Sequence, residues 1–375
     1  MGHFIHPPKS VHELSDGDAL VISDYMNTGL HRTKRTMVSE WFPQSAVQLT
    51  WPHAGTDWAY MLDEVHQCYK DMARAIVESG EKLILLVKDK VQATELLKDL
   101  PMDNILMISM PTNDTWTRDY GVISIDTPDG LKAIDFGFNG WGLKFASCHD
   151  NLANLRLRDM GLIPSDAYRN LRGYICEGGS LETDGQGTLL TTTECLCSPN
   201  RNGGLSKEEV EQVLSRELGF TRYLWLDHGY LAGDDTDSHI DTLARICPND
   251  TIVFVGCRDI DDEHFEALLN MRMQLESFTT ADGRPYRLLE LPMADAMYDE
   301  DGERLPATYA NYLVLNDRIL LPTYNQPDND RAATEIMRLA YPGYQIVGID
   351  CSALVRQHGS LHCSTMQIPQ GLLYL

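Results

Sequence analysis

Short apolar runs alternate with polar stretches along the chain, and an amphipathic segment stands near its beginning. The run 46–51 predicts a strand. From Asp57 to Ile76, apolar residues recur three and four positions apart, which predicts a helix with one buried face. A strand over 82–87 and a helix over 91–97 follow. This part of the chain therefore predicts an α/β fold.

From residue 105 onward one unit recurs: a short apolar strand, a polar loop, a hairpin and a helix. The opening strands are expected to begin near residues 105, 174, 223, 288 and 345. The hairpin turns are expected at 128–130, 184–185, 248–250 and 316–317. The helices are expected near 151–160, from Ser206 with a capping box, near 262–277 and near 328–339.

The fifth copy ends in a predicted strand over 361–368, and its partners have to come from the N-terminal region, which would close a ring. The recurrence favours a pseudo-symmetric array over two unrelated lobes. We therefore expect a single domain over residues 1–375, in which the polar loops that follow the opening strands converge near a common axis.

Composition and charge limit the possible partners. The chain has 375 residues, of which 43% are hydrophobic and 23% charged, as in an ordinary globular protein. A formal net charge of -24 argues against a nucleic-acid partner and suits a small cationic ligand, although acidity that only serves solubility is an equal alternative. Self-association into a homo-oligomer is left open.

The sequence offers no sign of a membrane or an export route. No apolar run reaches the ~18 residues of a membrane span, and the first twenty residues lack the apolar region of a secretion signal. Met1-Gly2 resembles a myristoylation site, but His6 stands where Ser or Thr is required. Nine cysteines, an odd number, suit reduced thiols. We expect a cytoplasmic protein with no membrane partner.

Two polar loops carry candidate binding groups. The loop NDTWTRDYG places Asp119 close to Trp116, and a carboxylate beside an aromatic ring suits a planar cation. The alternative is a turn with a salt bridge through Arg118 and a packed indole. In EGGS, Glu177 ends a strand and two glycines follow, which allows another group to approach the backbone closely. The alternative is a tight turn with a solvated acid.

A third loop, GDDTDSHIDTLAR, carries an acid/base pair. His239 and Asp241 lie two positions apart, so in an extended segment both side chains face the same way. A histidine beside a carboxylate is a unit that can exchange protons near neutral pH. Calcium is not indicated, because the glycine and glutamate that an EF-hand loop requires are absent.

The segment HGSLHC presents Cys363 among small and polar residues in the expected final strand, where alternation would separate it from His362. A papain-like site is excluded, because its local signature is missing and its cysteine precedes its histidine. Zinc is not expected either: no C-x2-C pair accompanies His358, His362 and Cys363, while Cys195 and Cys197 fit a strand leaving a hairpin.

Taken together, NDTWTRDYG, EGGS, GDDTDSHIDTLAR, YANYLVLNDRILLPTYN and HGSLHC resemble the agmatine deiminases and the related bacterial-type peptidylarginine deiminases of the guanidine-modifying superfamily. The resemblance covers the chain from about residue 110 onward. It implies a pentein fold, a five-bladed α/β propeller of ββαβ units. It also implies roles for six residues. Cys363 would be the nucleophile, His239 the acid/base and Glu177 a further active-site glutamate. Asp119 and Asp241 would bind the guanidinium, and Trp116 would flank the substrate.

Two segments depart from the family pattern. Agmatine deiminases have GGGNIHC before and including the nucleophile, where this chain has Gln357, His358, Gly359 and Ser360, and they have DGHID where this chain has DSHID. The resemblance implies hydrolysis of agmatine to N-carbamoylputrescine and ammonia in putrescine biosynthesis, through a thiouronium intermediate and without a cofactor. Peptidylarginine is the alternative substrate. A non-catalytic polyamine-binding protein is an alternative of another class.

The expected site also makes an electrostatic prediction. Three carboxylates near Cys363 should raise the pKa of its thiol above the ~8.5 of a model thiol while the site is empty. A bound cation should reverse that effect and favour the thiolate.

Overall fold

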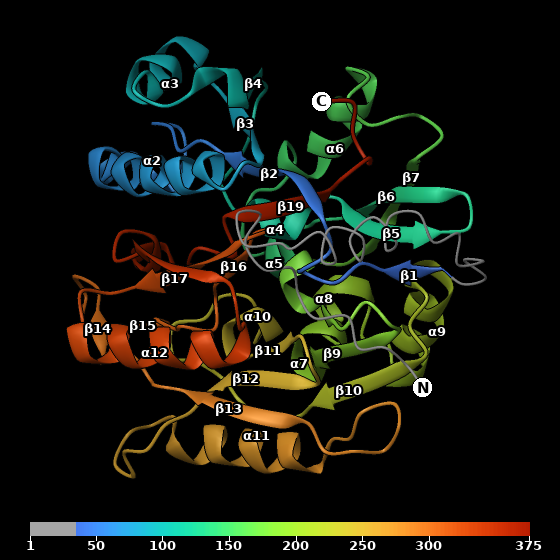
Figure 1. The fold of residues 1–375 in the computed structure, drawn as a ribbon, viewed down its shortest axis with the longest axis vertical. Coiled ribbons are helices and arrows are strands. Elements are labelled where there is room, and N and C mark those ends of the chain that lie inside the picture. Colours follow the sequence, from blue (N-terminus) through green and yellow to red (C-terminus); the bar gives the residue numbers. More distant parts are fainter. Residues whose placement is uncertain (1–34) are drawn as a thin grey trace.

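The computed structural model describes residues 35–375. The remarks above on a secretion signal and on myristoylation concern residues 1–34 and lie outside the described residues. The fold is mixed α/β, with several small sheets (Figure 1). Five of the sheets contain the same arrangement, an antiparallel pair whose second strand is parallel to a third strand.

The antiparallel pairs are β5 (Ile123–Thr127) with β6 (Gly130–Gly137), β8 (Glu182–Thr183) with β9 (Thr188–Thr192), β11 (Ala244–Cys247) with β12 (Thr251–Val255), β16 (Leu313–Val314) with β17 (Arg318–Thr323), and β19 (Thr365–Pro369) with β2 (Gln44–Thr50). The parallel strands are β7 (Tyr168–Ile175), β10 (Arg222–Leu226), β13 (Arg287–Leu291), β18 (Gln345–Asp350) and β3 (Lys82–Val87). All four predicted turns lie between the strands of a pair, so they are confirmed.

Short strands complete the sheets. β1 (Thr36–Met37) pairs with β5, and β4 (Ile105–Ser109) extends the sheet of β2 and β3. A separate pair consists of β14 (Met297–Tyr298) and β15 (Arg304–Leu305).

A helix leads from each antiparallel pair to the parallel strand. These helices are α6 (Ala153–Asp159), α9 (Lys207–Leu218), α11 (Phe265–Ser277), α12 (Pro327–Ala340) and α2 (Leu62–Glu78), and α3 (Lys90–Leu97) joins β3 to β4. The predicted capping box of α9 is present, since Ser206 and Glu209 each bond the other's backbone amide. Within the described part of the chain, no helix is both long and apolar enough to cross a bilayer.

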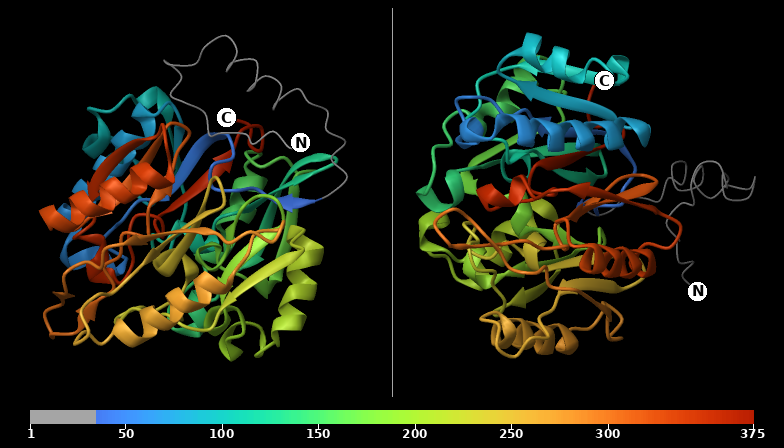
Figure 2. Two further views of the ribbon diagram at one scale, coloured as in Figure 1. Left: turned by 60° about the horizontal axis from the view of Figure 1, so that its bottom comes forward. Right: turned by 90° about the vertical axis from the view of Figure 1, so that its left-hand side faces the viewer.

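The long helices lie on the outside of the molecule, and short helices lie nearer its middle (Figures 1 and 2). The predicted apolar face of α2 explains its position, because Val65, Tyr69, Met72 and Ile76 are fully buried against the sheet. The short helices are α4 (Thr117–Tyr120), α5 (Gly140–Leu143), α7 (Thr193–Leu196), α8 (Pro199–Asn202) and α10 (Ile240–Leu243). The polar loops that follow the opening strands contain α4 and α10, so the fold brings these loops together.

The fifth unit takes its partner strand from the N-terminal part of the chain, as predicted: β19 pairs with β2, with Thr365 opposite Leu49. The predicted start of this last strand is wrong. Residues 361–364 form a turn and the strand begins at Thr365. Alternation therefore does not separate His362 from Cys363, and both side chains reach the same carboxylate oxygen of Asp241. Similarly, β7 begins at Tyr168 rather than near 174, because pairing with β6 extends it.

Candidate active site

Four loops from different units meet at one buried point. Asp119 lies on α4, Asp241 lies on α10, and the 3-10 turn Gly178–Ser180 packs between these helices. The loop of Cys363 is tied to α4 by the Arg118 backbone amide, which donates to the Cys363 carbonyl at 3.1 Å. A Cβ at Gly179 would lie 2.5 Å from His239 Nδ1 and 2.8 Å from Asp119 Oδ1. Only glycine permits this close approach.

The thiol of Cys363 is 5% exposed and is held by polar neighbours. Asn311 Nδ2 lies 3.2 Å from Sγ, and Asp241 Oδ2 lies 3.8 Å from it. Burial raises the pKa of Cys363 well above its usual value, and the charges of Asp241 and Asp119 raise it further. This direction agrees with the prediction, but burial is a larger cause than like charge. The role of Asn311 was missed, although it lies in the quoted segment YANYLVLN.

His239 is fully buried between two carboxylates. Its Nε2 lies 3.1 Å from Glu177 Oε2, and its Nδ1 lies 3.6 Å from Asp119 Oδ1. Burial acts to lower the pKa of His239, but the charge of Asp119 and the contacts with Cys195 and Glu177 raise it well above its usual value. The imidazole therefore favours its protonated form, which can donate a proton.

The expected extended geometry of this loop is wrong. His239 is the N-cap of α10 and Asp241 lies in its first turn, so the two side chains take different partners. The reason lies just upstream, where Asp237 and Ser238 have φ values of 62° and 61° and turn the chain into the helix. Both side chains still border Gly179.

Glu177 is fully buried and is paired with Arg201 as well as His239. Arg201 Nε donates to Glu177 Oε2 at 2.7 Å, and its Nη1 lies 2.5 Å from Asp237 Oδ2. Burial acts to raise the pKa of Glu177, but hydrogen bonding to His239 and the charge of Arg201 lower it. Glu177 is therefore an ionised acceptor that orients His239. Arg201 was missed, because no local pattern shows which carboxylate an arginine will meet.

Asp241 faces both His362 and the thiol. His362 Nδ1 lies 2.7 Å from Asp241 Oδ2. Burial acts to raise the pKa of Asp241, but His362 and His239 lower it, so the carboxylate stays ionised. Asp241 Oδ1, Glu177 Oε1 and His239 Nδ1 are buried and have no hydrogen-bond partner in the described protein. Such atoms cost about 1–3 kcal/mol each when unpaired. The two carboxylate oxygens therefore suit a ligand with several N–H groups.

Asp119 is oriented by a tryptophan that the sequence did not single out. Trp141 Nε1 donates to Asp119 Oδ2 at 2.9 Å, and Gly179 N donates to Oδ1 at 2.9 Å. Burial, together with the nearby Asp241 and Glu177, raises the pKa of Asp119 to about 6. Trp141 lies in α5, where Trp141 and Leu143 both have positive φ. Strain of this kind persists where the surroundings require it.

Replacing Trp141 with phenylalanine should keep the ring contacts with Phe138 and Phe145 but remove the N–H donor to Asp119. We expect kcat/KM of the enzyme to fall by about 10- to 100-fold, an effect of the size found when a supporting hydrogen bond is lost. Steady-state kinetics on the substrate proposed below measure it. Phe145→Leu, which alters an exposed neighbour, is the control, and an equal loss in both variants would contradict the positioning role.

Trp116 is 6% exposed and lies against Trp58, with ring centroids 5.6 Å apart. On another side it meets the backbone of Gly359, where a Cβ would come within 2.4 Å of the indole. The tryptophan therefore joins the loop of Asp119 to the loop of Cys363. Its role beside a substrate stays a prediction.

Each of the two segments that depart from the family pattern has one substituted residue on left-handed backbone. Ser238 has φ 61° and His358 has φ 64°. Their side chains form bonds that glycine could not: Ser238 Oγ to Glu194 Oε2 at 3.2 Å, and His358 Nδ1 to the Gly233 carbonyl at 2.7 Å. The chain thus keeps a backbone that suits glycine and adds polar contacts between loops.

This conformation predicts an unusual order of stability at position 238. Ser238→Gly removes the bond to Glu194 but relieves the backbone, so the free energy of unfolding should change little. Ser238→Ala loses the bond and keeps the strain, so it should be about 1 kcal/mol less stable than the glycine variant. Denaturant unfolding of both variants tests this order, and a more stable alanine variant would contradict it.

The expected strand around Cys195 and Cys197 is also wrong. Cys195 lies in α7 and Cys197 is its C-cap, because the Thr192 side chain caps this short helix immediately after β9. Among residues 35–375, one group of metal-ligand types lies close enough to share an ion: Glu177, Cys195 and His239. All three residues are buried.

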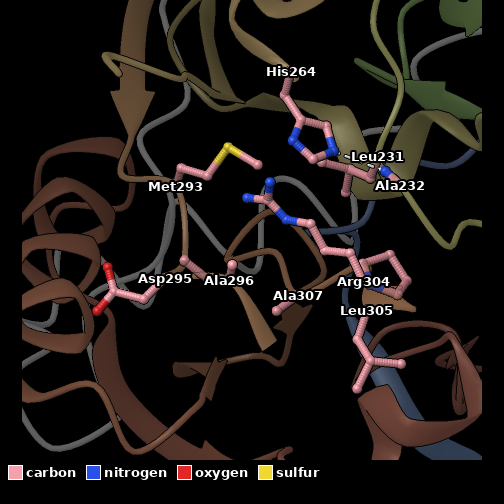
Figure 3. Close-up of a pocket in the computed structure, with 11 residues that line it drawn as sticks. Leu231, Ala232, His264, Met293, Asp295, Ala296, Arg304, Leu305 and Ala307 are labelled. Atoms are coloured by element: carbon pink, nitrogen blue, oxygen red, sulfur yellow. Dashed lines mark hydrogen bonds between the residues drawn. The ribbon is translucent and has the colours of Figure 1, made fainter. Parts of the chain in front are cut away.

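A separate pocket lies away from this site (Figure 3). Leu231, His264, Met293 and Arg304 are among its lining residues, and Ala232 N donates to His264 Nε2 at 2.8 Å. Its arginine is paired with Asp262 and Glu263, so it offers no free charge to a ligand.

Comparison with known proteins identifies close relatives. The model of the family described as Porphyromonas-type peptidyl-arginine deiminase matches residues 36–369. The "Putative agmatine deiminase" of Legionella pneumophila is 35% identical over 351 residues, which cover 92% of this chain and 99% of the relative. A solved structure of the "Putative Arginine Deiminase" from Porphyromonas gingivalis is 49% identical, with a TM-score of 0.86 and coverage of 91% and 100%. The C. jejuni agmatine deiminase with substrate bound is 36% identical, with a TM-score of 0.83 and coverage of 90% and 97%.

Proposed function

The chain belongs to the Porphyromonas-type peptidyl-arginine deiminase family, and from this membership we propose that it is an agmatine deiminase. It hydrolyses the guanidinium group of agmatine to N-carbamoylputrescine and ammonia, a step toward putrescine. One observation carries the proposal: the thiol of Cys363, the protonated imidazole of His239 and the carboxylates of Asp119 and Asp241 surround one buried point.

The first half of the reaction forms a covalent intermediate. Asp119 and Asp241 accept N–H bonds from the planar guanidinium and hold its charge. Cys363 releases its thiol proton to solvent as the cation binds, and Sγ attacks the central carbon. His239 donates a proton to the departing nitrogen, which leaves as ammonia. An S-alkylthiouronium on Cys363 remains.

The second half releases the product. Water takes the place of ammonia, and His239, now neutral, accepts a proton from it as it attacks the same carbon. The C–S bond breaks, the hydroxyl proton of the adduct passes to the sulfur, and the ureido product leaves with the thiol of Cys363 restored and His239 protonated again. Glu177 acts through His239, since its 3.1 Å contact keeps the imidazole oriented in both halves.

A cationic substrate should help to activate the thiol that attacks it. In the empty site the raised pKa keeps Cys363 protonated at neutral pH, so its alkylation by iodoacetamide should be slow and should accelerate with rising pH to above ~9. An inert guanidinium analogue should shift this acceleration to lower pH. Mass spectrometry of the peptide containing Cys363 separates its rate from those of the other cysteines. A pKa near 6 in the empty site would contradict this mechanism.

Agmatine suits the site better than arginine. The carboxylate of arginine would require a free cation, but Arg118 is buried against Glu40 and Gln367, Arg201 is paired with Glu177, and Lys144 is paired with Asp237. The low exposure of Cys363 also favours a small substrate over a peptide. Peptidylarginine remains the second candidate because of the family to which the chain belongs.

The decisive experiment incubates the purified protein with agmatine, arginine and an arginyl peptide, and measures both ammonia and ureido product. We expect turnover of agmatine, with kcat/KM at least about tenfold above the other two substrates, because an unpaired charge is costly in a buried site. A higher kcat/KM for the arginyl peptide than for agmatine would show that peptidylarginine, the second candidate, is the substrate. Binding of agmatine without ammonia release would support a polyamine-binding protein instead.

We also propose that the five repeated units form one domain, a five-bladed α/β propeller. The shared strand order of five sheets and the pairing of β19 with β2 support this arrangement. A cytoplasmic location is supported by nine cysteines that are all unpaired, as expected in a reducing compartment.

A further inference from the structure

A second thiol lies behind the proposed acid/base. Cys195 is fully buried on α7, and its Sγ lies 3.9 Å from Glu177 Oε2, the same oxygen that lies 3.1 Å from His239 Nε2. The ligand atoms of these three residues all lie within 4.8 Å of one another. The mechanism uses the imidazole and the carboxylate, but it leaves the sulfur of Cys195 without a role.

We propose that Glu177, Cys195 and His239 form a binding site for Zn²⁺ and that zinc bound there inhibits the enzyme. The inhibitory part rests on the proposed function, whereas binding of the metal does not. The site is distinct from the nucleophile, because Cys363 contacts Asn311 and Asp241 instead.

The spacing of the donor atoms suits tetrahedral zinc. Zinc binds nitrogen and oxygen at about 2.0–2.1 Å and thiolate at about 2.3 Å, so tetrahedral ligands place N and O about 3.3 Å apart and S and O about 3.5 Å apart. The distances from Glu177 Oε2, 3.1 Å to His239 Nε2 and 3.9 Å to Cys195 Sγ, require shifts of only a few tenths of an ångström, and the nitrogen and the sulfur, which lie within 4.8 Å of each other, have to move closer together. Thiolate, imidazole and carboxylate are also the ligand types that zinc prefers.

The charges around the cluster favour a cation. Glu177 Oε2 is the oxygen that lies near both His239 and Cys195, and Oε1 is buried with no hydrogen-bond partner in the described protein, so Oε1 is free to accept the Arg201 N–H bond when Oε2 ligates. Arg201 opposes a second cation, but Asp237 neutralises it at 2.5 Å, and Asp119 adds a negative charge on the other side of the imidazole. On binding, the thiol of Cys195 releases its proton to solvent.

Inhibition follows from the atom that zinc would occupy. Once Nε2 of His239 is bound to metal, the imidazole cannot be protonated at that nitrogen and loses its oriented contact with Glu177. Proton transfer to the leaving ammonia and from water would then fail together. Zinc should therefore lower kcat in a manner that a chelator reverses.

Cobalt gives a readout that does not depend on turnover, since Co²⁺ bound by thiolate absorbs in the near ultraviolet. We expect this band when Co²⁺ is added to the intact protein and to Cys363→Ser, and we expect Zn²⁺ to abolish it. Cys195→Ser should lose the band, whereas the matched variant Cys197→Ser, two residues along, should retain it. Absence of the band in Cys363→Ser, or its survival in Cys195→Ser, would overturn the site.

Inhibition is then measured with agmatine. The Zn²⁺ concentration for half inhibition should rise at least about tenfold in Cys195→Ser and stay unchanged in Cys197→Ser. Equal sensitivity of both variants would overturn the inhibitory role. If the protein proves inactive on agmatine, the cobalt spectra still decide whether the metal site exists, so the two proposals fail separately. Circular dichroism confirms that each variant is folded.

Discussion

Replacing Cys363 with serine is expected to lower kcat for ammonia release from agmatine by at least about 10⁴-fold, because the substitution removes the thiol that forms the covalent intermediate. A serine hydroxyl is a far weaker nucleophile than a thiol and lies in the same acidic surroundings. Agmatine should still bind, since Asp119 and Asp241 are unchanged. Binding of agmatine without turnover would show that the variant has lost its nucleophile but has kept its substrate-binding site.

Calorimetric titration of the serine variant with agmatine, together with an ammonia assay, measures both parts of this expectation. The matched control is Cys247→Ser, another buried cysteine, which contacts Tyr312 rather than the site and should retain activity. Activity within about tenfold of the parent in Cys363→Ser would refute the covalent mechanism.

Arg245→Met is expected to cost about 3–5 kcal/mol of the free energy of unfolding, the largest effect on stability that we expect. Arg245 is fully buried, is hydrogen-bonded to Glu182, and lies 3.3 Å from a carboxylate oxygen of Glu40. It also donates to two backbone carbonyls, and its guanidinium lies 4.6 Å from the centre of the Tyr312 ring. Methionine fills similar space but leaves buried carboxylates without their cation.

Two comparisons make this expectation specific. Removing both charges in Arg245→Met/Glu182→Leu should recover part of the loss, because the unpaired charge, and not the missing contact, dominates its cost. Arg258→Met breaks an exposed ion pair with Glu290 and should change the free energy of unfolding by less than about 1 kcal/mol. Urea unfolding measures all three variants. Equal losses for Arg245→Met and Arg258→Met would contradict the argument.

The repeated unit could be predicted because its signals are local. Turns such as 128–130 and 184–185 are determined by two or three neighbouring residues. The spacing of apolar residues in α2 predicts which face of the helix is buried. The motifs also pointed to four loops that the fold does bring together. Their chemical roles depended on the family resemblance, since no single loop contains a complete site.

The failed predictions concern local backbone geometry that hydrophobic periodicity does not encode, and contacts between residues far apart in the sequence. The geometry of His239 and Asp241 follows from a left-handed turn at Asp237 and Ser238, which the Asp234 carboxylate stabilises by accepting from the Ser238 amide. Trp141 and Arg201 matter because they meet Asp119 and Glu177, partners that periodicity cannot reveal. Short helices such as α7 were missed for a different reason, since four residues carry almost no periodic signal.

The pairing of β19 with β2 has a consequence for how the enzyme comes into being. Translation makes residues 44–50 early, yet their strand neighbour is residues 365–369, so the sheet that supports the nucleophile cannot be completed until the ribosome has passed both segments. A nascent chain that ends just before residue 363 contains the loops of Asp119, Glu177 and His239 but lacks Cys363. Incomplete translation products are therefore expected to be catalytically inactive.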